Sequence, residues 1–558
     1  MKTTKFNNGG SLFIETLKER NINQIYCCPG TTEVSIIDAC ADEDDFEFIL
    51  FPFEGSAVAA ADGHSRVTGT PQVVMLHANV GLANGISQIY SAKMSHSPIV
   101  VINVIKPRGL LSHGGITTTT HEQEMVKQYT RWDWQSLRSE DLVEDLNRAF
   151  QMAIKPPQGP TLLVIPQDVL EAPACEKSVY TFPRCNVNYR SAPADEDIDQ
   201  AARILAESSF PLIISGSGAG KENCIFEVKE LADMLGAGVC CESKWSFYHN
   251  CYPTTDRRFL GPYKADHPAA EKADVILALG AKLFAEFTLP AVPGIPGKAK
   301  LLHQHEDMKE IDKLYRADVP LCGNTLETVK KLKAALVPLL ESRKTLVASR
   351  NKTVELLNIK RTEEIEAALK KAAAAKPIRI ASLVDSISQV MDENTTVVVD
   401  TPTSDDHLVE YLKRPNSKSL YGQSCGSLGW GSGAALGVKC GDPGQRVICF
   451  TGDGTLLFGV QCIWTAYKYN IPVVFVVINN QRYAAVRKGL LHYNGVAVEK
   501  NIFPGTDISG IDYCSLANSF SVEAEKITEP EAVTPALEKA LQSQKPYLLE
   551  VMVDPDDF

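Results

Sequence analysis

Two continuously apolar segments, residues 446–450 and 471–478, lie on either side of a segment with helical periodicity at residues 457–469. Short runs without polar interruption are typical of parallel strands that are covered on both faces. The pattern therefore predicts a strand, a turn, a helix and a second strand, which form one βαβ unit. Because such crossovers are right-handed, we expect the carboxyl ends of both strands to meet at one edge of the sheet.

The alternation of apolar strands with helical segments runs along the whole chain. Further strands are predicted at residues 24–28, 46–51, 72–76, 210–215, 274–280, 396–399 and 545–554. Polar, proline-containing residues 175–195 and charged residues 371–376 interrupt the alternation and are typical of linkers. We therefore expect an α/β fold with three doubly wound parallel-sheet domains, at residues 1–180, 190–345 and 375–558. A length of 558 residues agrees with about three domains.

The composition is that of a globular protein, with 44% hydrophobic and 22% charged residues. A formal net charge of −12 argues against a dedicated surface for nucleic acid or acidic membranes. The 15 cysteines lack metal-finger spacing, which favours reduced core residues and a cytoplasmic protein. No apolar run approaches the length of a membrane span, and the N-terminus lacks the apolar region of a signal peptide. We therefore expect a soluble protein.

Polar side chains stand at the ends of the two strands of the βαβ unit. Gly452-Asp453-Gly454 follows the first strand, and Asn479-Asn480 ends the second. Mg²⁺ prefers oxygen ligands and often combines a carboxylate with phosphate oxygens. Glycines let the backbone approach a diphosphate, and the amides at the start of the next helix face its charge. Each motif alone is a common turn or strand end, but their pairing at strand ends predicts a magnesium–diphosphate site.

The paired motifs resemble the diphosphate motif of thiamine-diphosphate (ThDP) enzymes, in which GDG precedes NN at a similar separation. The resemblance implies that Asp453, Asn480 and the backbone carbonyl of Arg482 hold Mg²⁺. We expect further contacts to the cofactor from the residues around the GDG turn and from two hydroxyls in the segment DTPTS, which follows the strand at residues 396–399. These residues are Gly452, Gly454, Thr455, Thr403 and Ser404.

A second segment strengthens the resemblance. Residues 422–437, GQSCGSLGWGSGAALG, are similar to the family segment that holds the cofactor in its bent shape. On that basis Leu428 is the apolar wedge between the two rings of the cofactor. The Gly426 carbonyl then accepts a hydrogen bond from the exocyclic amine of the aminopyrimidine. A helix-packing loop is the alternative explanation for such a glycine-rich segment.

The segment EGSAVAAADGHSRVTG predicts an alanine-rich helix that begins at Glu54 and ends near Gly69. An acidic residue at the start of a helix is usually a favourable contact with the helix dipole. In ThDP enzymes the corresponding segment carries a glutamate that hydrogen-bonds the aminopyrimidine ring, and Glu54 maps onto it. A carboxylate shielded from water can share a proton with a ring nitrogen, so the resemblance implies that Glu54 assists deprotonation of the cofactor.

His77 follows the apolar strand at residues 72–76, where open α/β sheets place ligand crevices. Taken alone, a histidine at this position is more often structural than catalytic. The surrounding segment LHANVGLANGISQIYSAKMSHSPIVV is similar to that of benzoylformate decarboxylase, which implies proton transfer by His77. In the same comparison Thr31 and Thr32 stand where that enzyme family has a serine that contacts the substrate carboxylate.

Two features separate the possible enzyme classes. The segment THEQEMVKQYTRWDW resembles acetolactate-synthase-like proteins, and there Gln123 would approach the substrate. Glu122, however, stands where those synthases carry phenylalanine, which places the synthase interpretation in doubt. The region also lacks a His-His pair, which disfavours a typical pyruvate decarboxylase.

The resemblance implies a ThDP- and Mg²⁺-dependent nonoxidative decarboxylase of 2-keto acids with carboligase activity, similar to benzoylformate decarboxylase. Alternatives are an acetolactate-synthase-like acyl transferase, an FAD-containing keto acid oxidase and a catalytically silent ThDP-binding paralogue. Residues 216–220, GSGAG, follow a strand but lack the full dinucleotide fingerprint, so we expect no FAD. In this family the first and third domains of different subunits face each other, which implies a homodimer or homotetramer with interfacial active sites.

Overall fold

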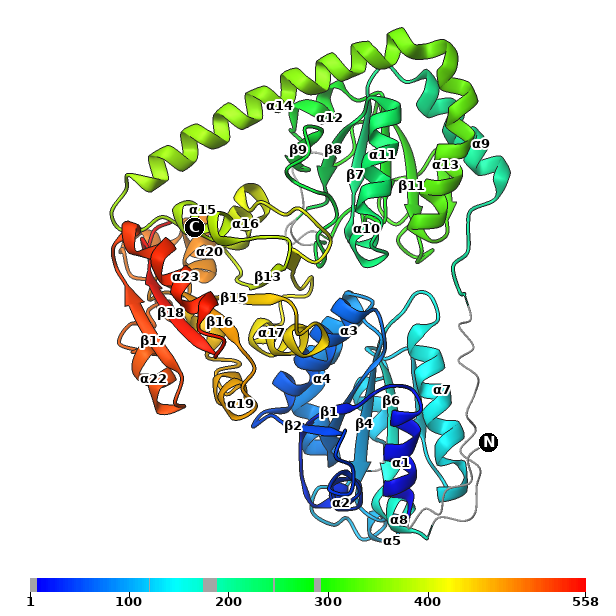
Figure 1. Cartoon of the computed structure of the whole chain (residues 1–558), viewed down its shortest axis with the longest axis vertical. Coiled ribbons are helices and arrows are strands. Elements are labelled where there is room, and N and C mark those ends of the chain that lie inside the picture. Colours follow the sequence, from blue (N-terminus) through cyan, green and yellow to red (C-terminus); the bar gives the residue numbers. More distant parts are fainter. Residues whose placement is uncertain (1–7, 120, 174–187, 244–245, 286–292, 558) are drawn as a thin grey trace.

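The protein folds into three α/β domains, each built on a six-stranded parallel sheet with helices on its faces (Figure 1). The computed structural model describes residues 8–119, 121–173, 188–243, 246–285 and 293–557. The predicted α/β class with three parallel sheets is therefore confirmed. Residues 175–187 of the predicted linker lie outside the described residues.

The first and third sheets have the same strand order. The first is ordered β2-β1-β3-β4-β6-β5 and the third β14-β13-β15-β16-β18-β17. The strand order reverses between β1 and β3 in the first sheet and between β13 and β15 in the third. Open α/β sheets bind ligands at such a reversal. The strands of the first sheet are β1 (Gln24–Cys28), β2 (Glu47–Leu50), β3 (Gln72–His77), β4 (Ile99–Ile105), β5 (Trp132–Gln135) and β6 (Thr161–Pro166). Those of the third are β13 (Thr395–Asp400), β14 (Leu420–Tyr421), β15 (Arg446–Gly452), β16 (Val473–Asn479), β17 (Glu523–Ile527) and β18 (Tyr547–Met552).

The middle sheet has the order β12-β11-β10-β7-β8-β9. Its strands are β7 (Pro211–Ser215), β8 (Gly238–Cys241), β9 (Phe259–Pro262), β10 (Val275–Leu279), β11 (Lys300–His305) and β12 (Val319–Cys322). The central strands β7 and β10 are buried along their whole length, as continuously apolar segments require when both faces of a sheet are covered.

Helices flank every sheet. In the first domain they are α1 (Gly9–Lys18), α2 (Val34–Cys40), α3 (Glu54–Thr68), α4 (Ala78–Met94), α5 (Arg108–Leu111), α6 (Glu122–Val126), α7 (Leu142–Ile154) and α8 (Gln167–Glu171). In the second they are α9 (Asp195–Glu207), α10 (Ser217–Lys221), α11 (Ile225–Leu235), α12 (Pro268–Lys272) and α13 (Thr325–Leu340). In the third they are α15 (Ile380–Val390), α16 (Asp405–Tyr411), α17 (Trp430–Gly441), α18 (Asp453–Leu456), α19 (Cys462–Lys468), α20 (Ala484–Tyr493), α21 (Val496–Glu499), α22 (Tyr513–Ser519) and α23 (Val533–Gln542).

The long helix α14 (Lys344–Ala373) runs along the outside of the molecule from the middle domain to the third (Figure 1). Arg350 anchors it, because its fully buried guanidinium donates hydrogen bonds to the backbone carbonyls of Leu205, Ala206, Ser208 and Leu235. These carbonyls end helices α9 and α11, where the helix dipole favours a cation. Arg350 thus ties the connecting helix to the middle domain.

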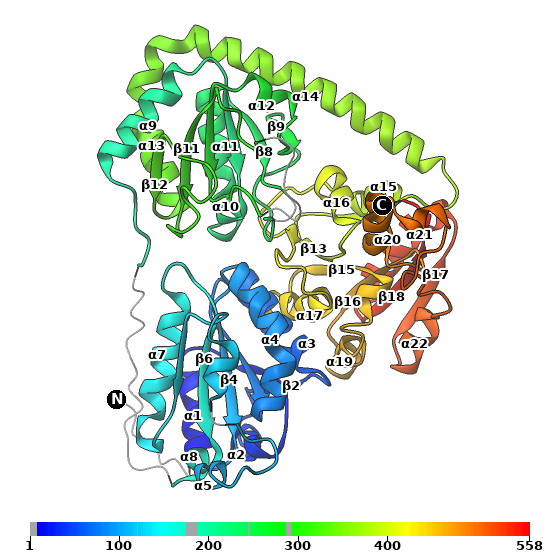
Figure 2. The same cartoon turned by 180° about the vertical axis from the view of Figure 1, so that it is seen from behind.

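Helices α3 and α17 join the first domain to the third, and both views place them side by side (Figure 2). A Cβ atom at Gly63 would collide with the backbone of Ala434, and one at Gly437 would collide with that of Ala60. The small residues in the AAADGHS and GSGAALG segments therefore serve close packing of two helix backbones. This packing also fixes how the first domain sits against the third.

All three domains meet at Arg66. Its guanidinium binds both carboxylate oxygens of Asp62 at 2.7 Å, lies 4.4 Å from the ring centroid of Trp430 and donates to the carbonyl of Gly422. The same group contacts the carbonyl of Tyr248 in the middle domain at 3.5 Å. Trp430 Nε1 in turn donates to Asp62 at 2.7 Å. The ion pair is buried and its hydrogen bonds are satisfied, so it holds the three-domain junction in one geometry.

Replacing Arg66 should destabilise the protein strongly. Arg66→Met leaves the Asp62 carboxylate buried without its cation, and breaking a buried pair in this way costs about 3–5 kcal/mol. We expect the midpoint of urea unfolding, followed by far-UV circular dichroism, to fall clearly below that of the wild type. The matched control is Arg138→Met, because Arg138 forms an exposed pair with Asp141 and exposed pairs contribute at most about 1 kcal/mol. Equal midpoints for both variants would contradict the proposed role of the junction.

Two local predictions differ from the structure. The helix predicted at residues 457–469 is shorter, because α19 covers only Cys462–Lys468. Gly459 lies in the turn between α18 and α19, where its carbonyl accepts a hydrogen bond from Ser432 Oγ at 3.2 Å. The segment ANVGLANG at residues 78–85 is rich in glycine and asparagine and predicts a turn before a helix at residues 86–94, but it is the start of α4, which begins at Ala78. Asn103 on the neighbouring strand fixes this start, since its amide donates to the carbonyls of Leu76 and Ala78.

Candidate active site

A cavity of about 780 Å³ opens at the carboxyl ends of β13, β15 and β16. Its wall contains every residue of the third domain that the sequence predicts to bind the cofactor or the metal. These residues are Thr403, Ser404, Gly426, Leu428, Gly452, Asp453, Gly454, Thr455, Asn480 and Arg482. The right-handed βαβ unit thus brings together motifs that lie far apart in the sequence.

Asp453 is the first residue of α18 and is almost completely buried. Its Oδ1 accepts from the amide of Gly454 and its Oδ2 from the amide of Gln481, both at 2.7 Å. Burial raises the pKa of the Asp453 carboxyl to about 6. A carboxylate that has lost water in this way is stabilised by a cation at its remaining lone pairs.

The loop after β16 brings the other predicted metal ligands to the cavity. The carboxamide oxygen of Asn480 accepts from the amide of Arg482 at 3.0 Å. Gln481 between them has a φ of 57°, the left-handed conformation, which makes a tight turn. Asp453, Asn480 and Arg482 therefore line the same cavity. A carboxylate, a carboxamide and a backbone carbonyl are a donor set that suits Mg²⁺.

Two polar atoms of the cavity-lining residues have no hydrogen-bond partner in the part of the chain that the structure describes. They are Asp400 Oδ1 and Thr401 Oγ1, and both are buried. Burial raises the pKa of Asp400 to about 7. Because unsatisfied polar atoms are rare in folded proteins, they suit a ligand with polar groups of its own. Together with the amides at the start of α18, this wall fits a diphosphate-bearing cofactor with its cation.

Gly454, which we expected to let the backbone approach a diphosphate, also has a packing role. A Cβ atom at Gly454 would collide with the ring of Tyr483, so this glycine makes room for a side chain of the protein. Gly426, in contrast, has a φ of 72° and open space around its missing side chain. The left-handed backbone at Gly426 turns the segment toward the cavity that it lines.

A second group of candidate residues lies in the first domain, at the carboxyl ends of β1 and β3. His77 Nδ1 lies 3.2 Å from both carboxylate oxygens of Glu33 and 2.9 Å from Thr32 Oγ1. Thr32 Oγ1 donates to Glu33 Oε1 at 2.6 Å. Glu33 is fully buried, whereas 19% of the His77 side chain is exposed. The partners of Nδ1 fix the orientation of the ring and leave its Nε2 for other contacts.

Thr32 itself faces the interior. Its hydroxyl also lies 3.0 Å from the carbonyl of Val104, and the side chain is buried. Thr31, the neighbouring hydroxyl of the predicted pair, is exposed and 3.4 Å from the ammonium of Lys106. In this conformation the Thr32 hydroxyl makes hydrogen bonds with His77 and Glu33, whereas the Thr31 hydroxyl is accessible.

Glu54 is the first residue of α3, as the sequence predicts. Its Oε2 accepts from the carboxamide of Asn84 at 3.0 Å. Burial, followed by the charge of Glu54, raises the pKa of the nearby Cys28 thiol to about 12. Asn84 thus holds one of the two carboxylate oxygens of Glu54.

Gln123 and Glu122 begin α6. Gln123 is half-exposed, and in the described parts of the chain no hydrogen bond joins it to Glu54 or His77. Glu122 is buried, its Oε1 has no hydrogen-bond partner among the described residues, and burial raises the pKa of its carboxyl. The residue that distinguishes this chain from the synthases is therefore an interior carboxyl group.

Sequence reasoning missed Glu33 and Asn84. Glu33 follows CCPGTT directly, so an acidic residue in the turn after β1 was an available signal. Its role depends on His77, which lies 44 residues further along the chain and reaches it only because β1 pairs with β3. Asn84 gave no signal, because it lies in a segment that seemed to be a turn.

The two groups of candidates are separate within one chain. The cavity is lined by residues of the third domain and by Phe247 of the middle domain. Among the described residues of the first domain, none lines it. Glu54 and His77 therefore do not reach the cavity wall of their own chain.

The glycine-rich segment after β7 has a structural explanation. A Cβ atom at Gly216 would collide with the backbone of Gly280 and Ala281, and one at Gly218 would come within 2.8 Å of the Gly280 Cα. The turn therefore packs against the loop after β10. These contacts account for Gly216 and Gly218 without any ligand.

The chain matches three family models. They are described as the N-terminal TPP binding domain, the central domain and the C-terminal TPP binding domain of thiamine pyrophosphate enzymes. They match residues 7–128, 198–332 and 406–551, respectively. The C-terminal model includes most of the residues that line the cavity.

Similar proteins include two types of enzyme. A benzoylformate decarboxylase of Pseudomonas aeruginosa is 26% identical over 96% of this chain and 97% of its own length. A probable acetolactate synthase large subunit of Methanocaldococcus jannaschii is also 26% identical, over 98% of this chain and 92% of its own.

Solved structures show the same fold. A ThDP-dependent 4-hydroxybenzoylformate decarboxylase of Rhodococcus jostii has a TM-score of 0.83 at 23% identity and covers 99% of this chain and 100% of its own. Benzoylformate decarboxylase of Polynucleobacter necessarius has a TM-score of 0.84 at 21% identity, with 99% coverage of both chains. Within the described residues, the structure contains no helix with the length and apolarity that a bilayer crossing demands.

Proposed function

Because the chain belongs to the thiamine-diphosphate-dependent enzyme family, we propose that it is a Mg²⁺-dependent, nonoxidative decarboxylase of 2-keto acids. Carboligation is the companion reaction. The observation that carries the choice of decarboxylase is the group formed by His77, Glu33 and Thr32 at the carboxyl end of β3. An imidazole held by a buried carboxylate, with part of its ring exposed, is suited to deliver a proton to a substrate.

The residues of the cavity would bind and orient the cofactor and its metal ion. Asp453, Asn480 and the Arg482 carbonyl would hold Mg²⁺, and the amides at the start of α18 would face the diphosphate. Leu428 and the Gly426 carbonyl would hold the cofactor rings. When bound, ThDP stabilises the negative charge left on the acyl carbon as carbon dioxide departs.

The residues of the first domain manage protons. Glu54 would share a proton with a ring nitrogen of the cofactor, while Asn84 keeps the carboxylate in place. An acyl carbon that has lost carbon dioxide must take up a proton before an aldehyde can leave. His77 would supply this proton through Nε2, because Nδ1 is bound to Glu33 and Thr32.

These roles require two copies of the chain. The cavity lacks any described residue of its own first domain, so Glu54 and His77 of a second copy would complete it. A closed dimer with two-fold symmetry supplies both halves of two identical sites, and a dimer of such dimers is a tetramer. We expect the smallest active species to be a homodimer.

An acetolactate-synthase-like acyl transferase is the second candidate, since a relative with that name covers 98% of this chain. It would attach the acyl group to a second keto acid in place of releasing an aldehyde. A panel of 2-keto acids, incubated with protein, ThDP and Mg²⁺, separates the two by product. Carbon dioxide with aldehyde supports the decarboxylase, 2-hydroxy-2-acyl acids support the synthase, and hydrogen peroxide indicates an oxidase. No product from a protein that binds ThDP indicates a silent paralogue.

His77→Ala tests the proton donor. ThDP and substrate should still bind, but aldehyde formation should slow by about 100-fold or more, as general-acid catalysis typically contributes. Carboligation should slow less, because the acyl carbon then bonds to a second carbonyl carbon and takes up no proton. Aldehyde and acyloin are measured by NMR at equal cofactor occupancy. His113→Ala, which removes an exposed histidine of the same domain, is the control. Equal aldehyde output from His77→Ala and wild type would return His77 to a structural role.

A further inference from the structure

Glu550 is a fully buried carboxylate in the middle of the otherwise apolar strand β18. β18 pairs with β16, whose last residue begins the loop with the proposed metal ligands. A charge inside a covered sheet is costly unless it is paired and hydrogen-bonded. No step of the proposed reaction uses Glu550, so its place in the core needs another explanation.

Three hydrogen bonds connect Glu550 to Asp453. Glu550 Oε1 accepts from Asn479 Nδ2 at 2.7 Å. Asn479 Oδ1 accepts from the amide of Gln481 at 3.1 Å. The same amide donates to Asp453 Oδ2 at 2.7 Å. Glu550 is thus linked through Asn479 to the turn between Asn480 and Arg482.

The chemistry of the two side chains gives this connection a direction. An ionised carboxylate only accepts hydrogen bonds, so Glu550 obliges Asn479 to present its NH₂ group to β18 and its oxygen to Gln481. That oxygen holds Gln481 in the left-handed conformation from which its amide reaches Asp453. The ammonium of Lys526 lies 3.1 Å from Glu550 Oε1 and forms an ion pair with the carboxylate.

We infer that Glu550 is a positioning residue of the metal site, which it orders through Asn479. This inference rests on the proposed function, since it assumes that Asp453, Asn480 and Arg482 hold Mg²⁺. Partners that orient metal ligands typically contribute about 10- to 100-fold to metal affinity. Without Glu550, Asn479 can turn its amide over, and the Gln481 turn loses the contact that holds its shape.

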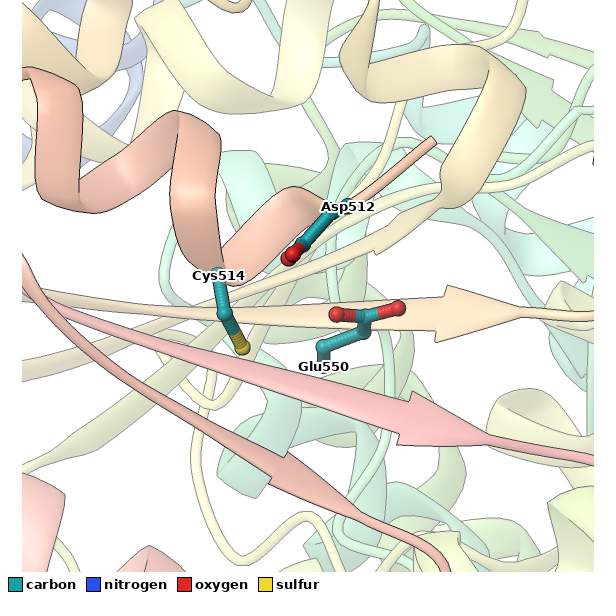
Figure 3. Close-up of side chains that lie close together, drawn as sticks. All are labelled: Asp512, Cys514 and Glu550. Atoms are coloured by element: carbon teal, nitrogen blue, oxygen red, sulfur yellow. The ribbon is translucent and has the colours of Figure 1, made fainter. Parts of the chain in front are cut away.

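Glu550 also lies close to Asp512 and Cys514 (Figure 3). Ligand atoms of these three residues lie within 4.8 Å of one another, which raises the alternative of a second cation site. Lys526 already neutralises Glu550, however, and both oxygens of Asp512 accept from Ser515. Burial, followed by the charge of Glu550, raises the pKa of the Cys514 thiol to about 12, so it is protonated. This group therefore serves as a control.

The test is a Mg²⁺ titration at fixed ThDP, followed by tryptophan fluorescence, which needs no substrate. Glu550→Leu and Asn479→Leu should each weaken Mg²⁺ binding by about 10- to 100-fold. The double variant should be little worse than either one, because both changes break the same connection. Glu550→Gln retains an acceptor for Asn479 and should lose less affinity.

Cys514→Ser changes a neighbour of Glu550 that takes no part in the three hydrogen bonds to Asp453, so it should bind Mg²⁺ as the wild type does. A loss in Cys514→Ser equal to that in Glu550→Leu would overturn the inference in favour of a second cation site. Wild-type affinity in folded Asn479→Leu would overturn it as well, even where Glu550→Leu fails to fold. A lower melting temperature without Mg²⁺, at unchanged affinity, would give Glu550 a merely structural role. Failure of the wild type to bind ThDP with Mg²⁺ would contradict the proposed function instead.

Discussion

Asp453→Ala is expected to lose Mg²⁺-dependent binding of ThDP. The change removes the only carboxylate among the three proposed ligands and also the acceptor of the Gln481 amide. The remaining carboxamide and carbonyl carry no net charge and cannot balance a divalent cation beside a diphosphate. Isothermal titration of ThDP with and without Mg²⁺ measures the loss.

Two variants make this result specific. Asp453→Asn keeps an oxygen acceptor and the shape of the side chain, so it should bind better than Asp453→Ala but well below the wild type. Asp442→Ala removes a carboxylate that pairs with Lys418 and does not line the cavity, so it should bind normally. Undiminished ThDP affinity in Asp453→Ala would remove the cavity from consideration as the cofactor site.

Glu54→Gln should bind ThDP and fail to activate it. The glutamine keeps the shape of the side chain and an oxygen that can accept from Asn84, but it has lost the group that exchanges a proton. Loss of such acid–base assistance typically slows a step by about 100-fold or more. The measurement is hydrogen–deuterium exchange at the reactive thiazolium carbon of bound ThDP, followed by NMR after acid quench.

The control for Glu54→Gln is Glu43→Gln, which changes a surface glutamate that pairs with Lys18 in the same domain. Its exchange rate should equal that of the wild type. A wild-type exchange rate in Glu54→Gln, at equal cofactor occupancy, would show that Glu54 does not assist deprotonation. The alternative role for Glu54 would then be the contact with the helix dipole.

Most of the sheet framework could be predicted from local pattern. The strand predicted at residues 24–28 is β1 without any shift, and the strand predicted at 471–478 is β16 shifted by one or two residues. Buried parallel strands can be recognised as continuous apolar runs in the sequence, because both of their faces need apolar side chains. The errors lie where distant residues decide the local structure, as Asn103 does at the start of α4 and Ser432 does at Gly459.

The candidate site also has a part that local sequence patterns predict and a part that they do not. The cavity wall could be predicted because the GDG and NN motifs follow consecutive strands of one βαβ unit. The ends of such strands meet at the same edge of the sheet. The residues that orient the candidate residues, Glu33 and Glu550, could not be predicted. Glu33 depends on the pairing of β1 with β3, and Glu550 depends on the pairing of β16 with β18, which lie about 70 residues apart in sequence. Pairings between distant strands follow from the topology and leave no local signature.

Mixing the Glu54→Gln and Asp453→Ala variants tests most directly whether one active site is shared by two copies of the chain. The two proteins are dissociated together, reassociated and assayed for exchange at the thiazolium carbon. Random reassociation makes about half of the dimers mixed, and each mixed dimer has one site with both Glu54 and Asp453 intact. We predict recovery of about a quarter of the wild-type exchange from two variants that are each inactive. An inactive mixture, with mixed dimers verified by native mass spectrometry, would place both residues in the site of a single chain and contradict the shared site.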